Sequence, residues 1–436
     1  MPSTRELASA LRVSRATVAT AYDQLVAEGY LAGQRGSGTF VCHELPDRPL
    51  ARLKPDDRRA AGGESHISAF AKRLGPVGMR AAMPPGTIDL SALDPDWTLF
   101  PFPVWNRLLR RHLRRMHSSV HRHTAGAAGH DALRDTIASY LARSRAVRCQ
   151  AEQIVIVNGS QQALDFCARV LVDVGDRVAI EEPGYQGARQ LFAAVGATVY
   201  PVPVDADGLL VGSIPSSVRL AHVTPSHQFP TGVSLSLARR LELLAWARSQ
   251  SAFVIEDDYD SEFRYDGAPL PSLQGLGDAS RIVYTGTFSL AMFPGLRIGY
   301  VVLPEPLVEP FLRVKWYSDR QTAYLEQAAL ADFIREGHLE RHIRRMRRVY
   351  KRRREALLDA LARYCGDRAS IAGDPAGLHV VVRFDRPDMA ARAERCGVGL
   401  ASTRSCYAGS APGNEFILRF AGLTERTLSE AIRRLA

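Results

Sequence analysis

Apolar segments of strand length alternate with longer amphipathic segments through most of this chain, and this alternation limits its fold more than any other feature. From about residue 87 onward each short apolar run is followed by a stretch with helical periodicity; the runs are 153–157, 177–180, 220–223, 253–256, 282–284 and 298–303. Strands joined by crossover helices pair in parallel within one sheet. The sequence therefore predicts an α/β domain with a mostly parallel sheet.

The composition is that of an ordinary globular protein. The chain has 436 residues, 46% of them apolar and 23% charged, which is enough for two or three domains. It has no apolar run of about 18 residues that would cross a membrane, and no signal layout for secretion. We therefore expect a cytoplasmic protein without a membrane partner. The six cysteines lack CxxC pairs and histidines at metal-ligand spacing, so we expect reduced thiols and no metal site.

Short periodic segments at the N-terminus predict two helices and a hairpin. Ser3 and Glu6 form a capping-box pattern at the start of the first helix. Ser14 caps a second predicted helix, which extends to about Ala27. A glycine-rich strand–turn–strand pattern then covers residues 31–41. The order is helix, turn, helix and wing; a generic small helical cap is the alternative interpretation.

Three strings within residues 2–41 resemble the winged helix-turn-helix of GntR-family regulators: PSTRELA, VSRATVATAYDQLVAEGYL and GSGTFV. The resemblance implies a DNA operator as partner, which the net charge of +10 permits. The side chains that it places on DNA are Arg5, Ser14, Arg15, Thr17 and Arg35. The family has another helix before the PSTR string, so we expect a truncated winged domain or a start codon upstream of Met1.

Several later segments carry groups suited to a phosphorylated aromatic ligand. The string NGSQQALD follows a strand and opens a helix, so its backbone N–H groups form a phosphate cup, although an ordinary capped helix would look the same. Tyr185 follows another strand and offers a ring for stacking. Asp257 ends a strand, where a carboxylate stabilises a protonated pyridine nitrogen, and Tyr259 lies two residues on. The segment 285–297 adds hydroxyl groups and a guanidinium.

Residues from about 88 to 436 resemble the aminotransferase-like domain of MocR-type GntR regulators. The matching strings include NGSQQALD, EEPGY, VTPSHQFPTG, EDDYDSEFRY, FPGLRIGY, LERHIRRMRRVYKRRR and AGLH. The resemblance implies the fold of type I transferases dependent on pyridoxal 5′-phosphate (PLP), a mostly parallel sheet flanked by helices with a small C-terminal α/β domain. It also implies a homodimer. The cofactor-binding residues that it implies are Gly159, Ser160, Gln161, Tyr185, Asp257, Tyr259, Thr287, Ser289 and Arg297.

The resemblance also divides the chain and gives each of these residues a role. Residues 1–41 would be the winged domain, 42–86 a linker rich in proline and glycine, and 87–436 the aminotransferase class I/II-like domain. Within that domain the large part would cover about 110–310 and the small part about 320–436. The NGSQQALD segment and Arg297 would bind the phosphate. Tyr185 would stack on the ring, Asp257 would face its nitrogen and Tyr259 its hydroxyl.

The chain departs from the family pattern at three places in this one site. The lysine that forms the Schiff base and moves the proton would stand at position 290, which is leucine. The segment that reaches the partner subunit's site reads TAGAAG at 124–129. The arginine that grips a substrate carboxylate is expected at position 417, which is isoleucine, and Arg419 on the same side of the strand is the candidate replacement. Leu290 cannot bond to PLP, so we expect non-covalent binding and no catalytic residue.

We therefore expect a DNA-binding transcriptional regulator whose aminotransferase-like domain senses a small ligand without transaminase activity. The effector would be an amino acid, an amine or a vitamin B6 form, and it would change the spacing of two winged helices through the linker. Two alternatives remain: a PLP-dependent aminotransferase that uses another base, and a decayed homologue. The lysines of the chain are Lys54, Lys72, Lys315 and Lys351.

Overall fold

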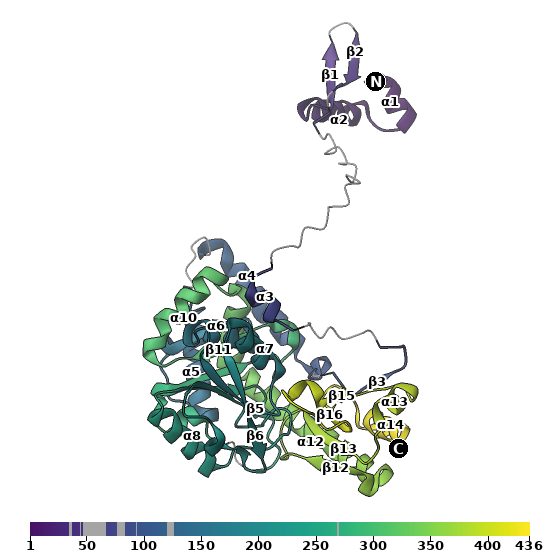
Figure 1. The fold of residues 1–436 in the computed structure, drawn as a ribbon. Helices are drawn as coiled ribbons and strands as arrows, with labels where there is room; N and C mark the ends of the chain where they lie inside the picture. The colour runs from purple at the N-terminus through teal and green to yellow at the C-terminus, as the bar shows by residue number, and fades with distance from the viewer. Residues whose placement is uncertain are drawn as a thin grey trace. The chain divides into compact units, whose positions relative to one another are not determined.

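The computed structural model describes residues 1–34, 37–43, 45–46, 67–75, 83–92, 94–119, 126–267 and 270–436. These described residues form two compact units, one within 1–66 and one within 67–436. Figure 1 shows both as ribbons. Each unit is considered by itself below.

The N-terminal unit has the helix, turn, helix and hairpin that its sequence predicts. Its elements are α1 (Thr4–Leu11), α2 (Arg15–Ala27), β1 (Leu31–Gln34) and β2 (Gly38–Val41), and the two strands pair antiparallel. The capping box is confirmed: Glu6 N donates to Ser3 Oγ at 3.2 Å, and Ser3 N donates to the Glu6 carboxylate at 2.9 Å. Thr17 N donates to Ser14 Oγ at 3.1 Å, which fixes the start of α2.

A small apolar cluster holds this unit together. Among its described residues the buried apolar side chains are Ala8, Val18, Tyr22 and Leu31. The Tyr22 hydroxyl donates to the carbonyl of Pro2 at 2.9 Å and ties the second helix to the start of the first. Large apolar side chains also remain exposed, among them Leu11, Val13 and Phe40. A core of this size gives the unit modest stability of its own.

The second unit is built on a large central sheet, and the predicted mostly parallel sheet is confirmed. In the described residues eight strands lie in the order β4-β11-β10-β9-β8-β5-β6-β7, with β11 and the edge strand β7 antiparallel to their neighbours. Their bounds are β4 Ile154–Val157, β5 Arg177–Glu182, β6 Thr198–Asp205, β7 Gly208–Leu209, β8 Val218–Val223, β9 Phe253–Asp258, β10 Ile282–Thr287 and β11 Gly299–Val302.

Helices cover both faces of this sheet (Figure 1). They are α4 (Phe102–Ser119), α5 (Asp131–Arg145), α6 (Ser160–Leu171), α7 (Gln186–Val195), α8 (Leu237–Ser249), α9 (Leu273–Leu276), α10 (Glu305–Ser318) and α11 (Tyr324–Arg335). Val155 and Val157 of β4 pack in the cluster formed with α6, α7 and α10, whereas Ile154 and Ile156 pack in the one formed with α4, α5 and α11. Burial on both faces explains why the strands are almost continuously apolar.

The C-terminal residues form a smaller α/β part. A four-stranded antiparallel sheet in the order β12-β13-β16-β15 packs against helices of this part in the described residues. Its elements are α12 (His338–Tyr364), β12 (Ala369–Ala372), β13 (His379–Phe384), α13 (Met389–Arg395), β14 (Val398–Gly399), β15 (Ala401–Ser402), β16 (Glu415–Arg419) and α14 (Glu425–Leu435).

Three segments lie elsewhere than the boundaries expected from the sequence. Helix α11 follows residue 320 but packs on α4 and α5, so the structure places it with the large part. Helix α3 (Ala69–Arg73) falls within the expected linker and contacts α7, where Gly75 N donates to Gln190 Oε1 at 3.1 Å. Strand β3 (Ile88–Asp89) pairs with β14 of the small part.

No helix in the described ranges is both long and apolar enough to span a bilayer.

Candidate functional site

A cavity of about 290 Å³ lies at the carboxyl ends of the parallel strands. Parallel sheets bind their ligands at this edge, because the loops that follow the strands converge there. Residues after β5, β8, β9 and β10 meet the start of α6 and the end of β16; the lining residues are Ser160, Gln161, Tyr185, Thr224, Phe229, Asp257, Tyr259, Thr287, Ser289, Leu290, Arg297 and Arg419. All the cofactor-binding residues expected from the sequence line the cavity except Gly159, which immediately precedes the lining residue Ser160 in the chain.

The start of α6 has the geometry of an anion cup. Gly159 is the N-cap with φ +91°, a conformation that glycine adopts without strain. A Cβ atom at this position would lie 3.3 Å from Arg297 Nη2, so glycine lets the guanidinium approach the helix start. Arg297 Nη2 donates to the carbonyl of Asn158 at 2.8 Å. The free N–H groups of α6 and this guanidinium together favour a bound phosphate.

Two hydroxyl groups extend the cup from the other side. Thr287 Oγ1 donates to Ser289 Oγ at 3.1 Å, and Ser289 N donates to Thr287 Oγ1 at 3.2 Å. Both side chains line the cavity with Ser160 and Gln161. This end of the cavity thus carries hydroxyl, backbone and guanidinium groups that could donate to an anion.

Asp257 lies deeper in the cavity and is buried. Its carboxylate accepts from Thr285 Oγ1 at 3.0 Å, and His222 Nε2 lies 3.5 Å from Asp257 Oδ2. A held, buried carboxylate is the group that stabilises a protonated heterocyclic nitrogen. The position of Asp257 therefore suits the nitrogen of a pyridine ring.

Tyr185 stands where a ring can stack. Its hydroxyl donates to Gln161 Oε1 at 3.1 Å, and its ring meets the edge of Phe229 at a centroid distance of 6.0 Å. Phe229 and Thr224 also line the cavity, although they received no role from the sequence. Both belong to the string VTPSHQFPTG. The sequence identified this motif but did not predict which of its side chains point into the cavity.

Tyr259 is turned toward a neighbouring histidine. Its hydroxyl donates to the carbonyl of His227 at 2.9 Å and lies 3.0 Å from His227 Nδ1. Burial, followed by the nearby Asp260 carboxylate, raises the pKa of this phenol well above its usual range. The hydroxyl therefore stays protonated and can act as a donor. His227 belongs to the string VTPSHQFPTG and received no role from the sequence, whereas in the structure it contacts Tyr259, which lines the cavity.

Leu290 occupies the wall of the cavity where an amine would be needed. Its side chain is 9% exposed and belongs to the apolar cluster shared with the small part. Lys315 does not replace the missing amine. Its Nζ is buried and donates to both oxygens of Asp319 at 2.9 Å and to Thr322 at 3.1 Å. Within the described ranges no lysine lines the cavity.

Arg419 reaches the cavity from the end of β16, and its Nη1 donates to the carbonyl of Ser91. Ile417, the position expected for a carboxylate-binding arginine, is buried with Val381 and Cys406 and is not among the lining residues. The structure thus places a guanidinium at the cavity through Arg419. Of the expected segment 124–129, residues 124 and 125 lie outside the described residues.

The residues expected to contact DNA are in the N-terminal unit. Arg5, Ser14, Arg15 and Thr17 are all exposed at or near the starts of α1 and α2. Arg35 lies outside the described residues. Exposed arginines beside a helix start match the way a recognition helix presents side chains to the major groove.

Comparisons with known proteins find a match for each of the two units of this chain. Residues 1–41 match the model for bacterial regulatory proteins of the gntR family, and residues 87–435 match aminotransferase class I and II. The chain is 41% identical over its full length to the probable rhizopine catabolism regulatory protein MocR of Rhizobium meliloti, covering 88% of that protein. It is 33% identical over 98% of its length to the pyridoxine biosynthesis regulator PdxR of Corynebacterium glutamicum, covering 88% of it.

The chain belongs to the MocR-type GntR regulators. Its second unit shares its fold with solved aminotransferases. LysN, the α-aminoadipate aminotransferase of Thermus thermophilus, matches with a TM-score of 0.76 at 26% identity, over 85% of this chain and 96% of that one. An archaeal alanine:glyoxylate aminotransferase matches with a TM-score of 0.77 at 26% identity over the same shares.

Membership in this family makes the protein an HTH-type transcriptional regulator with a DNA-binding domain and an aminotransferase-like domain. The fold of the second unit implies a PLP site. The cup at Gly159, the hydroxyls, Arg297 and Asp257 fit the phosphate and the ring of PLP. Leu290 does not fit a covalent bond to it. When PLP is bound by enzymes of this fold, it supplies an electron sink and the protein supplies the base, and this cavity offers no lysine as that base among the described residues.

Proposed function

We propose that this regulator binds a phosphorylated vitamin B6 form in its cavity without a covalent bond, and that ligand binding changes how its winged helices bind an operator. In this proposal the protein has no transaminase activity. It acts as a homodimer, and the part of residues 42–86 that precedes α3 links the sensing domain to the DNA-binding domain. The effector is the B6 form itself or an amino acid or amine that binds beside it.

One observation carries the proposal: the cavity keeps its anion cup while Leu290 stands on its wall. The cup combines the start of α6, Thr287, Ser289 and Arg297. Each hydrogen bond to a charged group contributes about 1.5–3 kcal/mol, so two or three of them contribute about 3–9 kcal/mol, which corresponds to dissociation constants from about millimolar to micromolar without a covalent bond. Loss of the lysine removes the chemistry and leaves these contacts in place.

The charges in the cavity favour an anionic ligand with a cationic ring. Arg297 and Arg419 bring two guanidinium groups, and Asp257 brings a carboxylate to the deeper end. A phosphate at the cup and a protonated pyridine nitrogen at Asp257 would satisfy both. Arg419 also lines the cavity and could contact the carboxylate of an amino acid bound there, which is why amino acids stay in the effector class.

The alternative of an aminotransferase with another base finds little support in the structure. A base must lie within hydrogen-bonding reach of the proton that it removes. Lys315 is held by Asp319 and Thr322 away from the cavity. Tyr259 is a protonated phenol whose hydroxyl donates a hydrogen bond to the carbonyl of His227, so it is not available as a base.

Borohydride trapping tests the proposal. The full chain is mixed with equimolar PLP and reduced with borohydride. Its intact mass is then measured by mass spectrometry, and any adduct is located by peptide mapping. We expect no stoichiometric adduct in the wild type, and one adduct at position 290 in Leu290→Lys. That variant is the matched control, because it restores the amine in the cavity. A full adduct on a wild-type lysine would show that another amine has taken the role and would overturn the proposal.

A further inference from the structure

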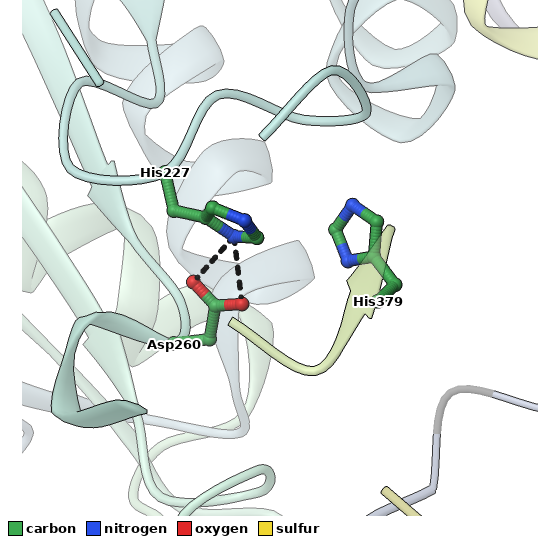
Figure 2. A group of neighbouring side chains, drawn as sticks. All are labelled: His227, Asp260 and His379. Carbon is green, nitrogen blue, oxygen red and sulfur yellow. Dashed lines mark hydrogen bonds and ion pairs between the residues drawn. The ribbon is translucent and has the colours of Figure 1, made fainter. Parts of the chain in front are cut away.

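A second cluster of ligand-like side chains lies behind the cavity. His227 follows β8, Asp260 follows β9 and His379 begins β13, and all three are buried. Figure 2 shows the two imidazole rings and the carboxylate gathered around one point, with the ring of His379 facing the His227–Asp260 pair. One nitrogen from each histidine and one carboxylate oxygen lie within 4.8 Å of one another.

The distances within the cluster are close to those of a metal site. His227 Nδ1 lies 3.0 Å from Asp260 Oδ2 and 3.2 Å from Asp260 Oδ1. Zinc binds histidine nitrogen and carboxylate oxygen at about 2.0–2.2 Å in tetrahedral geometry, so two ligand atoms on one ion are about 3.4 Å apart. The His227–Asp260 pair already lies within that separation, whereas the nitrogen of His379, which is within 4.8 Å of the other two ligand atoms, would approach them by up to about 1.4 Å to complete the site.

The hydrogen bond of His379 Nε2 leaves its Nδ1 able to bind a metal ion. His379 Nε2 pairs with the carbonyl of Pro230 at 2.9 Å. A carbonyl only accepts, so Nε2 carries the proton and Nδ1 presents a lone pair. That Nδ1 is buried and has no hydrogen-bond partner among the described residues. A histidine that donates one ring N–H to a backbone carbonyl is the usual arrangement of a metal ligand.

Two glycines leave room for this cluster. A Cβ atom on Gly377, which has φ +69°, would lie 2.0 Å from His227 Cε1 and 2.6 Å from Asp260 Oδ2. A Cβ atom on Gly232 would lie 3.1 Å from His227 Nε2. An ordinary histidine–aspartate hydrogen bond would explain His227 and Asp260, but it leaves the lone pair of His379 buried without a partner.

We propose that His227, Asp260 and His379 bind one divalent transition-metal ion, most favourably Zn²⁺. Two imidazoles and a carboxylate are a zinc ligand set that leaves a position open. The ion would join loops of the large part to β13 of the small part. It would also lie beside the Tyr259 hydroxyl, which contacts His227 and lines the effector cavity. The site would thereby couple metal binding to the cavity, and it does not depend on which ligand the cavity takes.

Metal uptake by the full chain tests this proposal. Chelator-treated protein is dialysed against Zn²⁺ and the bound metal is counted, and Co²⁺ is used in parallel as a spectroscopic probe. We expect one ion per chain and a visible Co²⁺ spectrum of low coordination number. His379→Gln keeps a donor for Pro230 and removes the ligand, and Asp260→Asn removes the charge with little change of shape. Each should weaken binding by about 10- to 100-fold or more.

A matched control separates this site from other histidines. His338 pairs with Glu336 outside the cluster, and His338→Gln should leave Zn²⁺ and Co²⁺ binding unchanged. Circular dichroism checks that the variants are folded, and if one of the two ligand variants does not fold, the other decides. Wild-type protein that takes up neither metal at micromolar concentration would overturn the proposal. Equal affinity of the wild type and a folded ligand variant would also overturn it.

Discussion

Replacing Arg297 tests the anion cup in the cavity directly. The guanidinium donates to the carbonyl of Asn158 and faces the start of α6, but its residue is exposed to solvent. A charged hydrogen bond contributes about 1.5–3 kcal/mol, and exposure favours the lower value. Arg297→Gln keeps most of the side-chain volume and removes the charge. We therefore expect its affinity for pyridoxamine phosphate to fall by about tenfold.

Pyridoxamine phosphate is the better probe because it cannot bond to surface lysines. Its binding is measured by isothermal titration calorimetry, with Arg313→Gln as control, since Arg313 pairs with Glu309 on α10 outside the cavity. Pyridoxamine, which lacks the phosphate, should bind the wild type and Arg297→Gln alike, because the lost contact is absent in both. An unchanged affinity for pyridoxamine phosphate, or an equal loss with both ligands, would refute the placement of the phosphate at this cup.

Three further outcomes follow from other residues. Gly159→Ala places a Cβ atom against Arg297 in a left-handed backbone conformation, so we expect at least tenfold weaker pyridoxamine phosphate binding in calorimetry, with unchanged affinity arguing against the cup. Burial lowers the pKa of His342 to about 4 from its usual 6.5, so the stability contributed by the neutral ring is present above pH 6.5 and is lost as the pH falls. Between pH 7 and pH 5 the free energy of unfolding in urea should therefore fall by about 2 kcal/mol more in the wild type than in His342→Phe. Equal pH dependence of the two proteins would contradict this expectation. Ser3→Ala removes half of a capping box and should cost α1 about 1 kcal/mol, seen as faster amide hydrogen exchange in α1 but not in the second unit.

The sequence predicted the fold well because each element carried its own signal. The strand segments, the capping box at Ser3 and the start of α2 at Ser14 all lie where local patterns placed them. These features depend on short-range periodicity and on caps, which one stretch of sequence contains in full. Helix α3 was missed because its five residues are too few for a periodic pattern, and its place depends on contacts with α7.

The site was predicted only as far as its motifs reached. The motif strings named the residues of the cup, but the exposure of a side chain to the cavity is set by tertiary packing. For this reason Thr224 and Phe229 were missed, and Arg419 could not be placed before β16 was seen beside the cavity. The cluster behind Tyr259 was beyond any spacing rule, because His227, Asp260 and His379 come from three segments that meet only in the folded chain.

The central claim is that a ligand in the cavity controls DNA binding without a covalent bond. Fluorescence anisotropy with DNA from upstream of the protein's own gene measures operator affinity while PLP or pyridoxamine phosphate is increased. We expect a saturable change in operator affinity at the ligand concentrations that fill the cavity, and loss of that change in Arg297→Gln. Operator binding that stays constant from no ligand to saturation would contradict it.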